Sequence, residues 1–255
     1  MNVLLSIMRR YPGLYQGLRS PYRKVRRLSN RVKVRDSGRD NLVSLADAWA
    51  VRNTEIVIEG DGNAIQSEMD ASLDGGRITI RGQGNQVLLG QGFMASGLII
   101  TITGDRNRIT VGDGCTLLST TMVCENDGNS ITIGATTEIH GGTELAAIEG
   151  THITIGENCG ISGGIHFVTG DSHSITDLDG RRINPSADIV IGDHVWVGTQ
   201  ATVMKGTSVA SNSIIGACSL VTRRFDTPHS IIAGNPAKLV KTGIDWRHER
   251  LPCEQ

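Results

Sequence analysis

The sequence predicts an all-β solenoid of stacked coils, and two periodicities predict this fold class. In residues 189–222 an aliphatic residue recurs every six positions and is mostly followed by a small residue. The recurring residues are Ile191, Val197, Val203, Val209, Ile215 and Val221. Residues two apart on a strand share a face. Short strands with one aliphatic face, interrupted by a turn every six residues, therefore predict triangular coils of eighteen residues.

A second period, of 22 residues, begins near residue 32. Its marker column is Asn41, Asn63, Asn85, Asn107 and Asn129, with Thr151 next. Apolar residues follow each marker by two and by ten positions, and turn sequences such as GDGN and GQGN precede most markers. Glycine and asparagine tolerate the positive φ of sharp corners. We interpret this half as the same solenoid enlarged by four residues per coil. We also expect the asparagines to hydrogen-bond as a ladder.

The two periods meet at Ile155, and the six-residue register then fails between Phe167 and Ile191. The intervening core positions would be His173, Asp179 and Pro185, none of which is an aliphatic core residue. Residues 171–188 are therefore predicted to leave the coil as a polar excursion, and loops on rigid scaffolds often carry chemistry. The β-helix domain is predicted to span residues 32–239.

The C-terminal segment 240–255 is predicted to be a tail that covers the end of the solenoid. Within it, residues 244–251 are expected to form a short helix over the open core, because solenoid ends otherwise expose core and unpaired edges.

The N-terminal segment 1–31 is a separate basic arm. It holds eight Lys/Arg and no acidic residue, whereas residues 32–255 hold 17 basic and 26 acidic residues. Apolar residues at helix-like spacings predict a helical arm. The arm either packs on a neighbouring subunit or contacts an anionic membrane surface or glycan. Nucleic-acid binding is a weaker third interpretation, because the basic patch is confined to the arm.

Composition agrees with a narrow solenoid core and a cytoplasmic location. The chain has 32 glycines, and aromatic residues make up 4% of it. Five cysteines form no CxxC pair, which favours small core or turn residues in a reducing compartment. No apolar run approaches a membrane span, and the N-terminus is too short and basic for a secretory signal. Peripheral contact at the inner membrane face, through the arm, remains open.

Two residues are candidates for chemistry. Trp196 lies between inward-facing valines and is expected to point outward, with Ile214 and Ile232 continuing an outward ladder. Such a ladder forms a subunit interface or the wall of a ligand groove. His173 lies on the excursion, where an imidazole could act as a general base, although a surface loop histidine is the simpler interpretation.

A zinc site is the natural competitor in this fold, and we do not expect one. Only His166 and His173 are close in sequence, and their spacing does not place both on one strand face. A covalent acyl-enzyme is also not expected, because no cysteine or serine has a recognisable base and orienting group.

Residues 166–241 resemble the hexapeptide-repeat acyltransferases. The matching segments are VTGDSHSI, IVIGDHVWVG, SIIGACSLVT and SIIAGNPAKLVK. The 22-residue repeats resemble the N-terminal halves of some bacterial capsule and lipopolysaccharide O-acetyltransferases. The resemblance implies a left-handed parallel β-helix, usually a homotrimer, with acetyl-CoA in a groove between subunits.

The resemblance also implies site residues. His173 matches the general base of the family, and Trp196 matches the tryptophan beside the pantetheine arm. The expected CoA-groove positions are Thr199, Ala217, Thr222, Arg223 and Lys238, of which the last two would meet phosphates. Arg223 stands where the family usually has lysine. The residue that orients substrate or histidine is not identified, and Thr143 and Glu144 are candidates.

The expected function is acetyl-CoA-dependent O-acetylation of a sugar hydroxyl in a bacterial surface polysaccharide. Two alternatives remain: N-acetylation of an amino sugar or nucleotide sugar, and a non-catalytic solenoid that binds or supports a partner. In the excursion, Asp179, Arg181, Arg182 and Asn184 either contact the glycan or are solvated loop charges.

Overall fold

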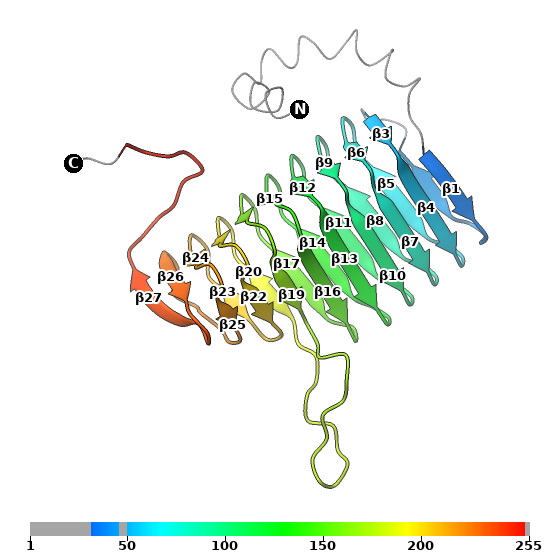
Figure 1. Ribbon diagram of the computed structural model, residues 1–255. Helices are drawn as coiled ribbons and strands as arrows, with labels where there is room; N and C mark the ends of the chain where they lie inside the picture. Colours follow the sequence, from blue (N-terminus) through cyan, green and yellow to red (C-terminus); the bar gives the residue numbers. More distant parts are fainter. Residues whose placement is uncertain (1–31, 46–49, 253–255) are drawn as a thin grey trace.

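The computed structural model describes residues 32–45 and 50–252, which form a parallel β-solenoid of three sheets (Figure 1). The predicted helical arm lies outside the described residues. Sheet A contains β1 (Val32–Asp36), β4 (Thr54–Glu59), β7 (Arg77–Arg81), β10 (Ile99–Thr103), β13 (Thr120–Glu125), β16 (Thr143–Ile148), β19 (His166–Val168), β22 (Thr202–Met204) and β25 (Leu220–Val221). Sheet B contains β2 (Leu42–Ser44), β5 (Ala64–Ser67), β8 (Gln86–Leu89), β11 (Arg108–Val111), β14 (Ser130–Ile133), β17 (His152–Ile155), β20 (Ile189–Ile191) and β23 (Ser208–Val209). Sheet C contains β3 (Ala50–Arg52), β6 (Ser72–Asp74), β9 (Met94–Ser96), β12 (Thr116–Leu118), β15 (Glu138–Ile139), β18 (Gly160–Ile161), β21 (Trp196–Val197), β24 (Ile214–Ile215), β26 (Ser230–Ala233) and β27 (Lys238–Thr242).

The strand register confirms both predicted coil lengths. Ile100 of β10 pairs with Ile78 and with Met122, so each of these coils adds 22 residues. Val203 of β22 pairs with Val221, so the later coils add 18. Among the strands of residues 32–45 and 50–252, those of successive coils pair in parallel, and β27 folds back antiparallel on β26. The inward columns that the periodicity predicted are buried from Val51 and Ile65 onward along the stack.

The predicted asparagine ladder exists at the corner between sheets A and B. The side-chain Oδ1 of Asn85 accepts from the backbone N (2.9 Å) and the Nδ2 (3.1 Å) of Asn107, and Asn107 repeats the pattern with Asn129. The ladder ends where Asn129 Oδ1 accepts from the backbone of Thr151 at 3.1 Å. The ladder therefore supplies hydrogen-bond partners for the buried polar groups at the wider corner of the 22-residue coils.

One glycine explains why the turns stack so closely at this corner. Gly82 has a φ of 142°, and a Cβ there would lie 2.0 Å from the carbonyl oxygen of Gly104 in the next coil. Only glycine fits both conditions.

Residues 171–188 leave the coil between β19 and β20 and extend away from the solenoid body as a two-armed loop (Figure 1). Backbone hydrogen bonds join the arms: Ile183 N donates to Ile175 O, and Asp177 N donates to Arg181 O, both at 2.8 Å. We call residues 171–188 the excursion loop.

Two sequence-based predictions are wrong near the C-terminus. Residues 244–251 form no helix; after β27 they run as an irregular segment beside sheet C. A two-turn helix is marginal on its own, and the irregular path instead lets Trp246 bury its side chain to 8% exposure. Ile232 is fully buried, and Ile231 takes the outward position beside Ile214, because this coil is one residue shorter.

No helix long and apolar enough to cross a membrane occurs in residues 32–45 or 50–252.

Candidate functional site

His173 lies at the base of the excursion loop, with an exposed side chain. The preceding Ser172 has a φ of 60°, which turns the chain sharply at this point. The backbone of His173 is fixed on both sides: its N donates to Asp171 O at 2.7 Å, and its O accepts from Asn184 Nδ2 at 2.8 Å. The imidazole is thus carried on a held backbone while its ring faces solvent, which suits a group that meets a substrate.

A first polar cluster anchors the two arms of the loop to the solenoid. Asp171 accepts from Asn184 Nδ2 at 2.8 Å and pairs with Lys205, which lies at the same corner one coil further along. Lys205 Nζ also donates to Asn184 O at 3.3 Å. The hydrogen bonds from Lys205 and then Asn184 lower the pKa of Asp171. Asp171 therefore stays ionised, and it acts as an anchor beside His173.

A second cluster joins the returning arm to the preceding coil. Arg182 donates to both carboxylate oxygens of Glu149, at 2.7 and 2.9 Å, and Ser186 Oγ donates to Glu149 Oε2 at 2.6 Å. These bonds, with those from Arg182 the larger cause, lower the pKa of Glu149 to about 2. Arg182 and Asn184 are thus occupied within the chain. At the tip, Arg181 pairs with Asp179 at 2.7 Å.

Trp196 lies on sheet C and points outward, as predicted, with 42% of its surface exposed. It pairs with Gly160 on one side and Ile214 on the other. Its Nε1 donates to Ser162 Oγ at 3.3 Å. The indole face is therefore presented on the wall of the solenoid.

The remaining predicted CoA residues fall into three places. Thr199 and Ala217 lie one coil apart at the corner between sheets C and A, where Thr199 Oγ1 donates to Gly163 O at 2.8 Å. Thr222 and Arg223 follow β25 at the corner between sheets A and B, and the Arg223 guanidinium lies 5.1 Å from the centre of the Phe225 ring. Lys238 begins the exposed strand β27 at the end of the stack.

A single chain does not bring these residues into one site. His173 lies on the loop that starts at the corner between sheets A and B, and Thr222 and Arg223 lie at the same corner further along the stack. Trp196 lies on sheet C, near Thr199. Within one chain, the predicted site residues therefore lie in separate groups on different sides of the solenoid.

Neither candidate orienting residue contacts His173 within the described chain. Thr143 is buried, and its Oγ1 bonds to the backbone oxygens of His140 and Ser162. Glu144 Oε2 lies 3.2 Å from His166 Nδ1 on sheet A. The loop anchors Lys205 and Glu149 were missed by sequence reasoning, because they lie at corners 34 and 33 residues from their partners.

Burial excludes three cysteines as nucleophiles. It raises the pKa of Cys115 and Cys159 to about 11 and that of Cys124 to about 12, so their thiolates are scarce near neutral pH. In the described part of the chain, no group of three or more His, Cys, Asp or Glu side chains could hold a metal ion.

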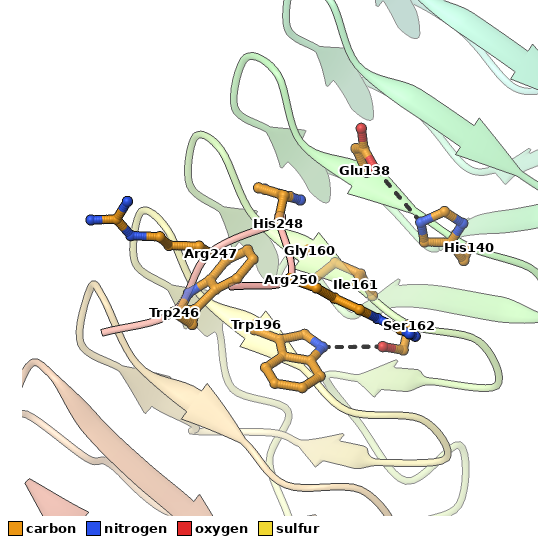
Figure 2. Close-up of a pocket in the computed structure, with 10 residues that line it drawn as sticks. All are labelled: Glu138, His140, Gly160, Ile161, Ser162, Trp196, Trp246, Arg247, His248 and Arg250. Carbon is orange, nitrogen blue, oxygen red and sulfur yellow. Dashed lines mark hydrogen bonds and ion pairs between the residues drawn. The ribbon is translucent and has the colours of Figure 1, made fainter. Parts of the chain in front are cut away.

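A groove beside Trp196 was not predicted. It has a volume of about 360 Å³ and lies between the wall of sheet C and the C-terminal tail (Figure 2). Trp196, Ser162, Gly160 and Glu138 line it from the wall, and Trp246, Arg247, His248 and Arg250 line it from the tail. The tryptophan of the segment IDWRHERL could have indicated this groove, but we had expected that segment to form a helix over the end of the solenoid.

Comparison with known protein families shows what one segment of the chain is similar to. Residues 188–223 match the family model for bacterial transferase hexapeptide (six repeats). These are the residues whose six-residue period predicted the triangular coils. The predicted resemblance to the hexapeptide-repeat acyltransferases is therefore confirmed.

Two curated acetyltransferases match short segments of the chain. A chloramphenicol acetyltransferase of Agrobacterium fabrum is 41% identical over 61 residues, which cover 24% of this chain and 29% of that protein. A polysialic acid O-acetyltransferase of Escherichia coli O1:K1 / APEC is 38% identical over 78 residues, which cover 30% of this chain and 25% of that protein. The chain thus spans less than a third of the length of these curated relatives.

Solved structures extend the likeness over most of the chain. The crystal structure of the polySia specific acetyltransferase NeuO aligns with a TM-score of 0.69 and 27% identity, covering 86% of this chain and 89% of that one. The polysialic acid O-acetyltransferase OatWY aligns with a TM-score of 0.55 at 23% identity, over 87% and 93% of the two chains, which speaks for the fold alone. The predicted fold class, a left-handed parallel β-helix, is confirmed.

Proposed function

We propose that the protein is an acetyl-CoA-dependent O-acetyltransferase that acetylates a sugar hydroxyl of a bacterial surface polysaccharide. The observation that carries the proposal is the position of His173: an exposed imidazole on a loop pinned by Lys205 and Arg182. The likeness of most of the chain to the polySia specific acetyltransferase NeuO supports the choice of a polysaccharide acceptor.

In the proposed reaction, His173 removes the proton of a sugar hydroxyl as that oxygen attacks the thioester carbonyl of acetyl-CoA. A backbone N–H of the groove stabilises the tetrahedral oxyanion. The C–S bond then breaks, the CoA sulfur takes the proton from the imidazolium, and the acetyl ester remains on the sugar. Transfer is direct, in keeping with the raised pKa values of the three buried cysteines.

The proposed active unit is a homotrimer whose sites lie between subunits. The half-site with His173 and the half-site with Trp196 occupy different walls, so a second copy has to supply the missing half. Residues Trp196, Thr199, Ala217, Thr222, Arg223 and Lys238 are proposed to contact CoA. The proposed location is the cytoplasm, with the arm of residues 1–31 packing on a neighbouring subunit or meeting the inner membrane face.

The test is incubation of the purified protein with labelled acetyl-CoA and a panel of capsular and lipopolysaccharide oligosaccharides. We expect label in at least one oligosaccharide, and its release by mild alkali, because esters are cleaved while amides survive. His173→Ala should lower turnover by about 10²- to 10⁴-fold and leave CoA binding intact. Full activity of His173→Ala would remove the imidazole from the mechanism, and alkali-stable label would favour N-acetylation.

A further inference from the structure

The excursion loop has one buried side chain, that of Asn184. The structure describes all of residues 171–188, and every other member is exposed or half-buried, whereas Asn184 is 8% exposed. Polar side chains are rarely buried without hydrogen-bond partners. An asparagine buried at the centre of an otherwise exposed loop is therefore expected to hold that loop together through its amide.

The Asn184 amide uses all four of its hydrogen-bonding positions. Its Oδ1 accepts from Ile175 N at 2.7 Å and from Arg182 Nε at 3.2 Å. Its Nδ2 donates to Asp171 Oδ2 and to His173 O, both at 2.8 Å. Because Ile175 N and the Arg182 guanidinium only donate, and His173 O only accepts, the amide fits in one orientation.

Three of these four bonds surround His173 in the sequence. One is made to the carbonyl of His173 itself, and the other two are made to Asp171 and Ile175, each two residues away. His173 N also donates to Asp171 O at 2.7 Å. One side chain thus holds three points within five consecutive residues. The main chain from which the imidazole extends into solvent is therefore placed by Asn184.

Asn184 is itself connected to the solenoid on both sides of the loop. Lys205, from the coil that follows the loop, donates to Asn184 O at 3.3 Å and pairs with Asp171. Arg182, which bonds Oδ1 of Asn184, pairs with Glu149 of the preceding coil. The rigid stack and the main chain of His173 are therefore joined through the Asn184 amide.

We propose that Asn184 is the positioning residue of the reaction, and that it places His173 through the main chain without contacting the imidazole. The inference rests on the proposed function, which makes His173 the general base. Thr143 and Glu144, the candidates for an orienting role from the sequence, bond elsewhere. A general base that is displaced by about 1 Å can lose about 100-fold in rate, so a fixed main chain matters for proton transfer.

Kinetics of Asn184→Ala in the full chain test this placement. We expect kcat to fall by about 10- to 100-fold and the Kd for CoA to stay unchanged. The apparent pKa in the pH profile of kcat should also stay unchanged, because Asn184 bonds the main chain of His173 and not its ring. Asn184→Asp keeps the size and the acceptor oxygen but cannot donate to His173 O, so it should lower kcat as well. Asp179→Ala, which removes a side chain of the same size from the exposed loop tip, is the matched control and should change none of these quantities.

A double variant separates the placement of His173 from a general structural role. In the His173→Ala background there is no imidazole to place, so Asn184→Ala should cause no further loss of the residual acetyl transfer. A residue that supported the CoA groove or the fold would lower the rate by the same factor in both backgrounds, and that result would overturn the proposal. Unchanged kcat in both Asn184 variants would overturn it too.

Amide hydrogen exchange tests the placement without turnover. The Ile175 N–H is bonded to Asn184 Oδ1, so in Asn184→Ala it should exchange about tenfold or more faster, with little change in the melting temperature of the solenoid. Unchanged exchange at Ile175 and His173 would show that Asn184 does not order the loop, and the proposal would fail. If the exchange responds as expected but the wild type transfers no acetyl group, the placement of His173 by Asn184 stands and the enzymatic proposal fails.

Discussion

The guanidinium of Arg182 forms a two-point ion pair with the carboxylate of Glu149, 33 residues earlier in the chain, with N–O distances of 2.7 and 2.9 Å. Glu149 closes a corner of the solenoid, and Arg182 lies on the returning arm of the excursion loop. The pair therefore ties the loop that carries His173 to the rigid stack. This contact allows loop order to be changed without altering any proposed reacting group.

Arg182→Met removes the ion pair while keeping much of the side-chain length. We expect kcat to fall, because His173 loses part of its fixed placement, while the Kd for CoA stays unchanged. Steady-state kinetics and CoA titration measure the two quantities. Arg181→Met, which alters the solvent-exposed pair with Asp179 at the loop tip, is the matched control. Equal effects of the two substitutions would contradict a specific anchoring role.

The same pair predicts how loop order depends on pH. The pKa of Glu149 is lowered from 4.5 to about 2, so its contribution is present above pH 4.5 and is lost as the pH falls toward 2. Pepsin cleavage within the loop can be followed over this range. The wild type should resist cleavage near pH 5 and approach the rate of Glu149→Gln near pH 2. Because both proteins meet the same protease, its own pH dependence cancels. A constant ratio of the two rates would show that the carboxylate does not order the loop.

The asparagine ladder predicts a stability effect inside the 22-residue coils. Asn107→Ala removes the acceptor used by the backbone and the side chain of Asn129, and it removes one of the two donors to Asn85 Oδ1, the Nδ2 group, while the backbone N–H of residue 107 remains. The buried N–H of Asn129, left unpaired, costs about 1–3 kcal/mol, and the two lost side-chain hydrogen bonds cost about 0.5–1.5 kcal/mol each, so we expect the free energy of unfolding to fall by at least about 2 kcal/mol. Denaturant unfolding measures the change. Gln83→Ala removes an exposed amide from a neighbouring turn and should cost less than about 0.5 kcal/mol.

The solenoid could be predicted from the sequence because each coil repeats the same pattern of residue types. Inward aliphatic residues, corner glycines and the asparagine column recur at fixed spacing, so one misread position does not change the register. The course of the C-terminal tail depends instead on one long-range contact. Trp246 donates a hydrogen bond to His194, 52 residues earlier, and packs in the space left by Gly160. No local sequence pattern predicts this contact.

The candidate site was predictable only in part, for the same reason. Trp196 faces outward because strand alternation requires it. His173 stood out because it interrupts the six-residue register. Their separation onto different walls depends on which corner the loop leaves from, and the anchors Lys205 and Glu149 are contacts between coils. Such contacts follow from the stacked structure and not from local spacing.

The two proposed half-sites lead to a last prediction, which concerns mixtures of subunits. His173→Ala and Trp196→Ala should each lower acetyl transfer strongly when they form homo-oligomers. If every site combines His173 of one subunit with Trp196 of another, co-refolding the two variants creates some sites with both residues intact. Activity of the mixture should then rise well above that of either variant alone. Mixing after folding, without subunit exchange, should give no gain and is the control.

If co-refolded mixtures recover no acetyltransferase activity while wild-type protein refolds to full activity, each site draws both residues from one chain. His173 and Trp196 would then have to approach each other through a rearrangement of the excursion loop, because the loop starts at the corner between sheets A and B, whereas Trp196 lies on sheet C.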